Sequence, residues 1–249
     1  RQSSMARLYK GHAADAVRCA SPQGITPMRI VHHLENSRSL RVLWMLEELG
    51  LRYELRMLPF PPRALAKDYL ALNPLGTVPL LTADDGVRLT ESAATCQYLA
   101  ARHSPGGLDV AAHEPDHAAY LNWLHMSDAT LTFPQTLVLR YARFEPPERQ
   151  QPQVAHDYAR WFLGRLRALE AALADGRPHL CAGRFTAADV AVGYAVMLAS
   201  FIDLPQPLPG SVAAYWQQLT QRPAYARAQA AQHAAALAQG VSPRPSPLG

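Results

Sequence analysis

The chain has 249 residues, of which 49% are hydrophobic and 18% charged, and its formal net charge is +4. This length is enough for one or two domains with a sizeable core, and the composition argues against a disordered chain. The chain is only mildly basic and has no run of lysine and arginine, so we expect no nucleic-acid partner. An uninterrupted apolar stretch of about 18 residues is missing, so we expect no membrane partner.

Cysteine and histidine spacing argues against a disulfide framework and against a metal site. Cys19, Cys96 and Cys181 form no closely spaced pair, which favours a reducing, cytoplasmic location. His32 and His33 are adjacent in a predicted strand, so their side chains would point to opposite faces. We therefore expect no metal.

Residues 28–103 predict a mixed α/β unit. The expected order is a strand over 28–33, a helix over about 40–50, a strand over 53–58, a short helix ending near Tyr69, strands over 78–81 and 87–90, and a helix over 91–102. The first strand–helix–strand segment favours a parallel pair of strands. Asp84-Asp85-Gly86 predicts a hairpin turn between the last two strands.

Residues 104–113 are interpreted as a linker, after which strand-like alternation almost disappears. Helical periodicity predicts an all-helical unit over 114–238, with helices over about 115–144, 153–174, 187–201, 212–221 and 224–238. Thr186 and Asp189 have the spacing of a capping box, with Asp in place of the usual Glu or Gln, and we assign them a structural role.

The two ends of the chain lack regular patterns. Residues 1–27 show no clean periodicity and no compact apolar run, which fits a secretory signal poorly, and we predict a disordered extension. Residues 239–249 contain three prolines. Since proline cannot continue a helix, we predict a flexible tail there.

Four short stretches, taken together and in order, resemble those of one family. They are Ser37-Arg-Ser-Leu-Arg41-Val, Asn73-Pro-Leu-Gly-Thr-Val-Pro79, Leu89-Thr-Glu91-Ser92 and Phe185-Thr-Ala-Ala-Asp189. The chain resembles the cytosolic glutathione S-transferases, and residues 120–131 are similar to a bacterial and fungal subgroup with a serine-type active site, which is theta/delta-like. The resemblance implies a thioredoxin-like βαβ-α-ββ-α domain followed by an all-helical bundle domain.

Ser37 is the first candidate for activating the glutathione thiol. It follows a predicted strand and precedes a helix, where a hydroxyl and free N–H groups stabilise an anion. Ser37 or Ser39 could instead simply cap the helix. In the family the serine stands four residues before the arginine that Arg41 matches, so the resemblance implies that Ser37 holds the nucleophilic thiolate. Asn36 is the alternative, because its amide donates equally well.

The resemblance also implies which residues hold the rest of glutathione. A cis bond before Pro79 would present the backbone of Val78 to the cysteine of the tripeptide. Ser92 would hold the γ-glutamyl carboxylate at a helix N-terminus, and Glu91 would accept from the ammonium group.

Two parts of this binding site are less well defined by the resemblance. Thr77 stands where many relatives have lysine or another polar group, which leaves Arg63 or Lys67 as a partner of the glycine carboxylate. The pocket for the acceptor substrate is expected between the domains, lined by Leu34, Trp123, Met126, Ser127, Thr130 and Phe133.

The expected function is that of a glutathione S-transferase. Glutathione is the co-substrate, with no cofactor, and its thiolate attacks a small hydrophobic electrophile, as in detoxification, with glutathione peroxidase as a side activity. The resemblance also implies a cytoplasmic homodimer. Two alternatives stay open: a non-catalytic regulatory or protein-binding module, and a glutathione-dependent disulfide reductase. A serine in place of an active-site cysteine argues against the reductase.

Overall fold

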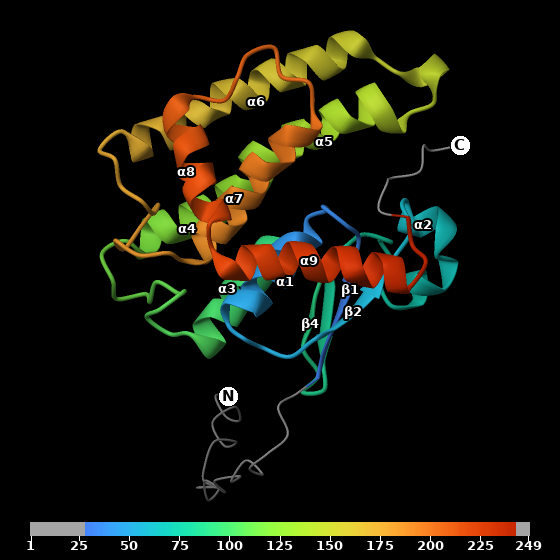
Figure 1. Ribbon diagram of the computed structural model, residues 1–249, viewed down its shortest axis with the longest axis horizontal. Helices are drawn as coiled ribbons and strands as arrows, with labels where there is room; N and C mark the ends of the chain where they lie inside the picture. The colour runs from blue at the N-terminus through green and yellow to red at the C-terminus, as the bar shows by residue number, and fades with distance from the viewer. Residues whose placement is uncertain (1–27, 243–249) are drawn as a thin grey trace, which may run out of the picture.

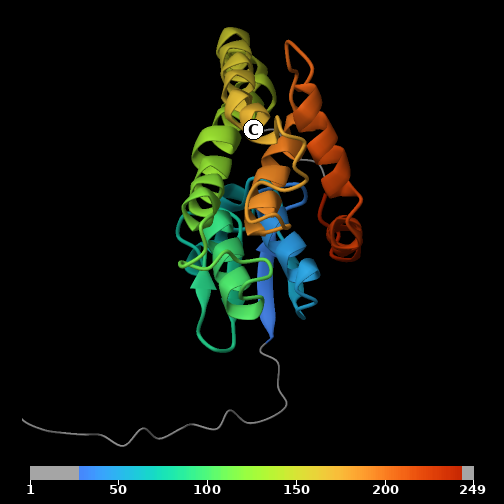
Figure 2. The same cartoon turned by 90° about the vertical axis from the view of Figure 1, so that its left-hand side faces the viewer.

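The computed structural model describes residues 28–242. The predictions for residues 1–27, for Cys19 and for residues 243–249 of the tail lie outside the described residues. The two perpendicular views in Figures 1 and 2 show a sheet-bearing unit at one end of the molecule and a bundle of helices at the other.

The sheet-bearing unit has the predicted order of elements. They are β1 (Arg29–His33), α1 (Ser39–Glu48), β2 (Glu54–Met57), α2 (Pro62–Leu65), the 3-10 helix η1 (Lys67–Ala71), β3 (Leu80–Ala83), β4 (Arg88–Leu89) and α3 (Ser92–His103). The strand order is β2-β1-β3-β4. The predicted parallel pair, β1 with β2, and the hairpin of β3 and β4 are confirmed, and β3 runs antiparallel to β1. This is the thioredoxin-like arrangement that the resemblance implies.

The helical unit contains six α-helices and several 3-10 and π segments among the described residues. They are α4 (His117–Met126), η2 (Ser127–Thr132), α5 (Phe133–Leu139), η3 (Arg140–Phe144), η4 (Pro147–Arg149), α6 (Pro152–Leu173), α7 (Ala187–Leu198), η5 (Ala199–Phe201), α8 (Gly210–Thr220) and α9 (Pro223–Ala238). The predicted helix over 115–144 is one helical run in which η2 and η3 are π-helical. A π turn takes more residues than an α turn, so each one rotates the face that follows it.

Helix α1 lies at the junction of the two units. Its residues 39–46 are all buried, because α1 packs on β1 and α3 and also on α7 and α9. Helix α9 contacts both α1 and β2 and lies across them in Figure 1. The segment that leads from β1 into α1 is therefore enclosed by elements of both units.

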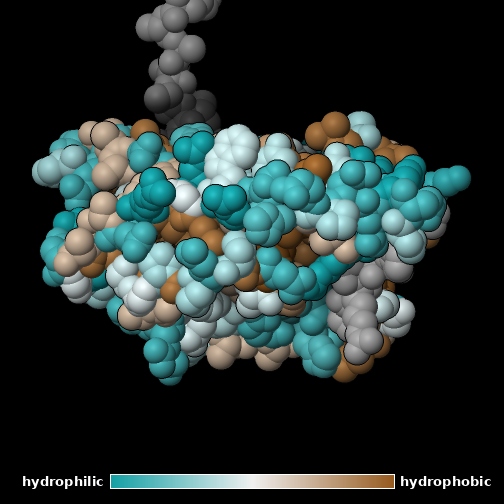
Figure 3. Space-filling view, turned by 90° about the horizontal axis from the view of Figure 1, so that it is seen from above, coloured by the Kyte–Doolittle hydropathy of each residue, from teal (hydrophilic) through white to brown (hydrophobic). Residues whose placement is uncertain are grey.

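The helical unit has a buried centre and a polar outside. All 12 residues of α7 are buried. The face seen in Figure 3 is mostly hydrophilic, with a hydrophobic band along its middle and smaller hydrophobic areas at its edges. Among the described helices, none combines the length and apolar character that crossing a membrane requires.

The predicted capping box at the start of α7 is confirmed. Thr186 Oγ1 accepts from the Ala188 N–H at 3.3 Å, and Asp189 Oδ2 accepts from the Thr186 N–H at 2.8 Å. We expect Thr186→Ala to lower the free energy of unfolding by about 0.5–2 kcal/mol, because the cap is lost. Urea unfolding measures this, with Thr220→Ala as a control at the last residue of α8, where the hydroxyl donates only to the Gln217 carbonyl within its own helix. Equal losses in both variants would contradict the assignment.

Candidate active site

A cavity of about 420 Å³ opens between the two units. The sheet-bearing unit contributes the segment between β1 and α1, the segment before β3, and side chains near α2. The helical unit contributes apolar and aromatic side chains from α5, η3, α7 and η5. The lining is residues 34–38 and 76–78, Phe60, Pro62, Arg63, Thr136, Leu139, Arg143, Phe144, Tyr194, Leu198 and Phe201. The cavity thus has a polar end near the start of α1 and an apolar wall.

A tight turn places Asn36 and Ser37 at the polar end. The Ser37 N–H donates to the Leu34 carbonyl at 3.0 Å, and the Ser37 carbonyl accepts from the Leu40 N–H at 2.9 Å. Asn36 has φ of 58°, in the left-handed region that asparagine tolerates better than most residues. Both candidate thiol-activating residues therefore lie beside the first turn of α1, at the cavity.

A chain of hydrogen bonds runs inward from Ser37. Ser37 Oγ lies 2.8 Å from Ser39 Oγ, which lies 2.7 Å from His33 Nδ1, and His33 Nε2 lies 3.0 Å from Gln232 Oε1. Gln232 Oε1 also accepts from the Asn36 N–H at 3.0 Å. All four side chains are thus linked from the cavity to α9.

The Gln232 end of this series of hydrogen bonds determines which atom is the donor in each bond. Gln232 Oε1 can only accept, so His33 Nε2 carries a hydrogen. Burial lowers the pKa of His33 to about 4, so the ring is neutral and Nδ1 accepts from Ser39. The single hydroxyl hydrogen of Ser39 is then used in the bond to His33, so Ser37 must donate to Ser39 Oγ. The Ser37 hydrogen points inward, away from the cavity.

Asn36 presents the donor that the network leaves free. Its Oδ1 atom accepts from Gln232 Nε2 at 2.8 Å, and no described residue accepts from its Nδ2 group. The other hydroxyl nearby, that of Tyr194, donates to the Asn36 carbonyl at 3.3 Å. Of these three side chains, only Asn36 can donate to a ligand without giving up an existing hydrogen bond.

The buried His33 predicts a pH dependence of stability. Its pKa is about 4 in the folded protein and near 6.5 for an exposed histidine. Between these values the unfolded chain binds a proton that the folded protein excludes, so the free energy of unfolding falls as the pH is lowered. The slope is at most about 1.4 kcal/mol per pH unit for one proton. Urea unfolding from pH 7 to 4 should show this slope in the wild type and a smaller one in His33→Gln. Parallel slopes would contradict the prediction.

The segment before β3 offers free backbone groups. The Val78–Pro79 bond is cis, as the resemblance implies. Tyr69 Oη and Asn73 Nδ2 donate to the Thr77 carbonyl at 2.7 and 2.8 Å, which holds the segment in place. The N–H and carbonyl of Val78 bond to no described residue, although Val78 lines the cavity. An extended peptide could therefore pair with Val78.

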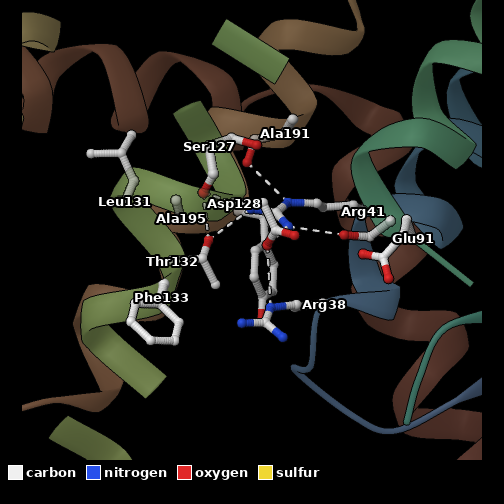
Figure 4. A network of polar contacts seen from close by, with 12 residues as sticks. Arg38, Arg41, Glu91, Ser127, Asp128, Leu131, Thr132, Phe133, Ala191 and Ala195 are labelled. Carbon is white, nitrogen blue, oxygen red and sulfur yellow. Dashed lines mark hydrogen bonds and ion pairs between the residues drawn. The ribbon is translucent and has the colours of Figure 1, made fainter. Parts of the chain in front are cut away.

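Glu91 and Ser92 lie at the start of α3, outside the cavity lining. Ser92 is 2% exposed, and its Oγ accepts from Arg41 Nη1 at 2.9 Å. Glu91 is exposed. Figure 4 shows Glu91 on the same side of the network as Arg41. Glu91 and Ser92 stand at the N-terminal end of α3, where an anion is favoured.

Arg41 is a buried centre of polar contacts that joins the two units (Figure 4). Its side chain is fully buried. The guanidinium donates to the Ala191 carbonyl of α7, Ser92 of α3, and three oxygens of η2, those of Ser127, Asp128 and Thr132. It also lies 4.6 Å from the centre of the Tyr194 ring. In the sequence, Arg41 indicates only the position of the serine four residues before it.

The expected acceptor pocket needs correction. Leu34 lines the cavity, but the five residues predicted from the long helix do not. Trp123 is buried in the core, and Ser127 is buried beside Arg41. Met126 packs against the core, Thr130 lies outside the lining, and Phe133 is 52% exposed. The wall comes instead from Thr136, Leu139, Arg143 and Phe144, which lie farther along the same helical run.

Charges at the cavity favour an anionic ligand. Arg38, Arg63 and Arg143 line it, against one acidic residue, Glu35. Arg38 and Arg143 also form ion pairs with Asp128 and Asp203, which lie outside the lining. Lys67, the other candidate for the glycine carboxylate, lies at a separate hollow near His32.

The described cysteines are unsuited to chemistry at this site. Cys96 and Cys181 are buried free thiols outside the cavity lining. Burial raises the pKa of Cys96 to about 12 and that of Cys181 to about 11, so both are protonated at neutral pH. Within residues 28–242, no three histidine, cysteine or acidic residues gather as metal ligands do.

Known proteins with the same features are glutathione S-transferases. Residues 37–102 match the family model of the glutathione S-transferase N-terminal domain. Glutathione S-transferase GstB of Escherichia coli strain K12 is 33% identical over 193 residues, which cover 74% of this chain and 88% of that protein. Glutathione S-transferase 3 of Schizosaccharomyces pombe is 38% identical over 104 residues, 42% of this chain and 43% of that protein.

Solved structures extend the similarity to both units. A sphingomonad glutathione S-transferase complexed with glutathione superposes with a TM-score of 0.71 at 25% identity, and the match covers 82% of this chain and 98% of that one. The likeness therefore includes the helices that close the cavity as well as the sheet.

Proposed function

Because the chain belongs to the glutathione S-transferase family, we propose that it is a glutathione transferase that activates the glutathione thiol at the Asn36–Ser37 turn. The thiolate sulfur forms a bond with an electrophilic carbon, and the leaving group departs with the bonding electrons. The observation that carries this proposal is the position of a free amide donor, Asn36 Nδ2, beside an apolar cavity.

Thiol activation requires groups that favour the thiolate. An ordinary thiol has a pKa of about 8.5, and donors to the sulfur lower it. Asn36 Nδ2 supplies such a donor, and Arg38 adds a positive charge at the cavity. We assign most of the lowering of the thiol pKa to Asn36, because Ser37 would first have to break its hydrogen bond to Ser39. The Ser37 hydroxyl remains the second donor.

The rest of glutathione is proposed to extend from Val78 toward α3. The Val78 backbone pairs with the cysteine of the tripeptide, held by the cis Pro79. Ser92 and the N-terminus of α3 bind the γ-glutamyl carboxylate, and Glu91 accepts from the ammonium group. Arg63 and Thr77 lie at the other end and are proposed to meet the glycine carboxylate.

The acceptor is proposed to be a small hydrophobic electrophile. The wall that faces Asn36 consists of Leu34, Phe60, Leu139, Phe144, Leu198 and Phe201, all lining one cavity. Apolar and aromatic walls of this kind bind ligands by excluding water, with few polar contacts. Turnover of such electrophiles, as in detoxification, is the proposed role, with reduction of organic peroxides as a side activity.

Retention on immobilised glutathione together with turnover of a generic aryl halide tests the function. We expect both. Retention without turnover of aryl halides or peroxides would favour a non-catalytic binding module. Turnover of glutathione disulfides alone would favour the reductase, which the buried state of Cys96 and Cys181 argues against. Failure to bind glutathione would overturn the proposal.

Assembly and location are further parts of the proposal. We propose a cytoplasmic homodimer, as the family resemblance implies. The buried free thiols of Cys96 and Cys181 support a reducing compartment. Light scattering at micromolar concentration should give twice the chain mass, and a monomeric mass would refute the dimer.

A further inference from the structure

Gln232 lies on α9, far along the chain from the turn before α1, yet its side chain is bound to that turn. It is 1% exposed. Its Oε1 atom accepts from the Asn36 N–H and from His33 Nε2, both at 3.0 Å, and its Nε2 atom donates to Asn36 Oδ1 and Gln229 Oε1. A buried amide whose two ends are both paired has one favourable orientation.

The first consequence concerns the Asn36 side chain. Because Gln232 Nε2 can only donate, Asn36 must turn Oδ1 toward α9. Its Nδ2 group then lies on the opposite side of the amide, where Asn36 lines the cavity. If α9 did not offer a donor at this point, the Asn36 amide would be free to rotate and to present either atom to a ligand.

The second consequence reaches Ser37 through two other residues. Gln232 Oε1 keeps the hydrogen of His33 on Nε2, which leaves Nδ1 to accept from Ser39. Ser39 Oγ in turn accepts from Ser37 at 2.8 Å. One side chain on α9 thus sets the hydrogen direction at both residues of the turn.

We propose that Gln232 is a positioning residue for thiol activation, which turns the Asn36 amide donor toward the cavity and, through His33 and Ser39, turns the Ser37 hydrogen away from it. This inference rests on the proposed glutathione transferase function. In this proposal, α9 determines whether the Asn36 amide or the Ser37 hydroxyl donates to the thiolate.

The test compares Gln232, which is buried in α9, with Gln239, which is exposed directly after α9; both bond to the sheet-bearing unit. Gln232→Met keeps the length of the side chain and removes its hydrogen bonds. Gln239→Met is the matched control, because Gln239 also pairs with backbone, accepting from the Met57 N–H and donating to the Leu55 carbonyl, each at 2.9 Å, away from the turn. Thermal unfolding reports the structural cost of each change, and the pKa of the bound thiol comes from thiolate absorbance and from rate against pH.

We expect Gln232→Met to raise the pKa of bound glutathione by about one unit and to lower kcat about tenfold at neutral pH, with recovery at high pH. The KM for glutathione should change less than about threefold, since Val78 and Ser92 are untouched. Gln239→Met should lower the melting temperature without moving the thiol pKa. In Asn36→Gly/Gln232→Met, the second change should raise the thiol pKa no further, because the donor that Gln232 turns toward the cavity is already absent.

A second variant keeps the test decisive if Gln232→Met does not fold. Gln232→Glu retains the acceptor atoms and the shape but cannot donate to Asn36 Oδ1, so the Asn36 amide should turn its Nδ2 group to the carboxylate. The thiol pKa should rise again, and by more than in Gln232→Met, because the added carboxylate also disfavours the thiolate. An unchanged thiol pKa in the folded variant, beside a wild type that binds and turns over glutathione, would overturn this inference alone. A wild type that does not bind glutathione would instead overturn the proposed function.

Discussion

Asn36→Gly should raise the pKa of bound glutathione by about one to two units and reduce turnover at neutral pH by about tenfold to a hundredfold. Loss of a donor to a charged acceptor costs about 1.5–3 kcal/mol, and one pKa unit corresponds to about 1.4 kcal/mol. Glycine adopts the positive φ of this position without strain, so the change reports on the side chain. Rate against pH and thiolate absorbance measure it, and high pH should restore part of the rate.

Ser37→Ala is the comparison that identifies the donor. Its hydroxyl hydrogen points to Ser39 rather than into the cavity, so we expect a loss of turnover below about threefold. The Leu34 N–H continues to donate to Ser39 Oγ in this variant. A larger effect from Ser37→Ala than from Asn36→Gly would show that the hydroxyl turns outward when glutathione binds, and that Ser37 is the main donor.

Arg41→Met should lower the free energy of unfolding by about 3–5 kcal/mol. The fully buried guanidinium holds α3, η2 and α7 together, and its removal leaves buried carbonyl and hydroxyl oxygens without a donor. For a chain of this size, each kcal/mol lowers the melting temperature by about 2–4 °C. Urea unfolding and thermal unfolding should therefore both show a large loss.

Arg227→Met is the control for charge removal at an interface. Arg227 also connects two helices, α9 and α1, through an ion pair with Glu47 at 2.7 Å, but its side chain is 55% exposed. Exposed pairs contribute about 0–1 kcal/mol. Similar losses for Arg41→Met and Arg227→Met would mean that the Arg41 contacts do not stabilise the junction.

Local patterns in the sequence were sufficient for most of the fold. The apolar spacing in residues 40–50, which end at Gly50, predicts α1, and the alternation in 53–58 predicts β2. Both patterns depend on residues that are close together in the chain. The long helix over 115–144 shows the limit. Its periodicity does not show which part of the run meets the cavity, so the predicted residues, within 123–133, precede those that line it, within 136–144.

The candidate site was also predicted only in part, because local motifs identify some of its residues and long-range contacts define the others. Ser37, Asn36 and Val78 were found because they lie in short motifs beside element ends, and the structure brings all three to one cavity. The roles of His33 and Gln232 depend on a contact between residues 199 positions apart. A histidine in a strand and a glutamine in an alanine-rich helix carry no local signal for such a contact.

This separation matters during synthesis on the ribosome. The turn with Asn36 is translated 196 residues before Gln232, which at about 5–20 residues per second is a delay of about 10–40 s. Throughout that time the nascent chain has β1 and α1 but lacks the amide that pairs with His33 and Asn36. The donors of the turn are therefore set in place only after the last helix has been made, and an unfinished chain does not hold a correctly oriented thiol site.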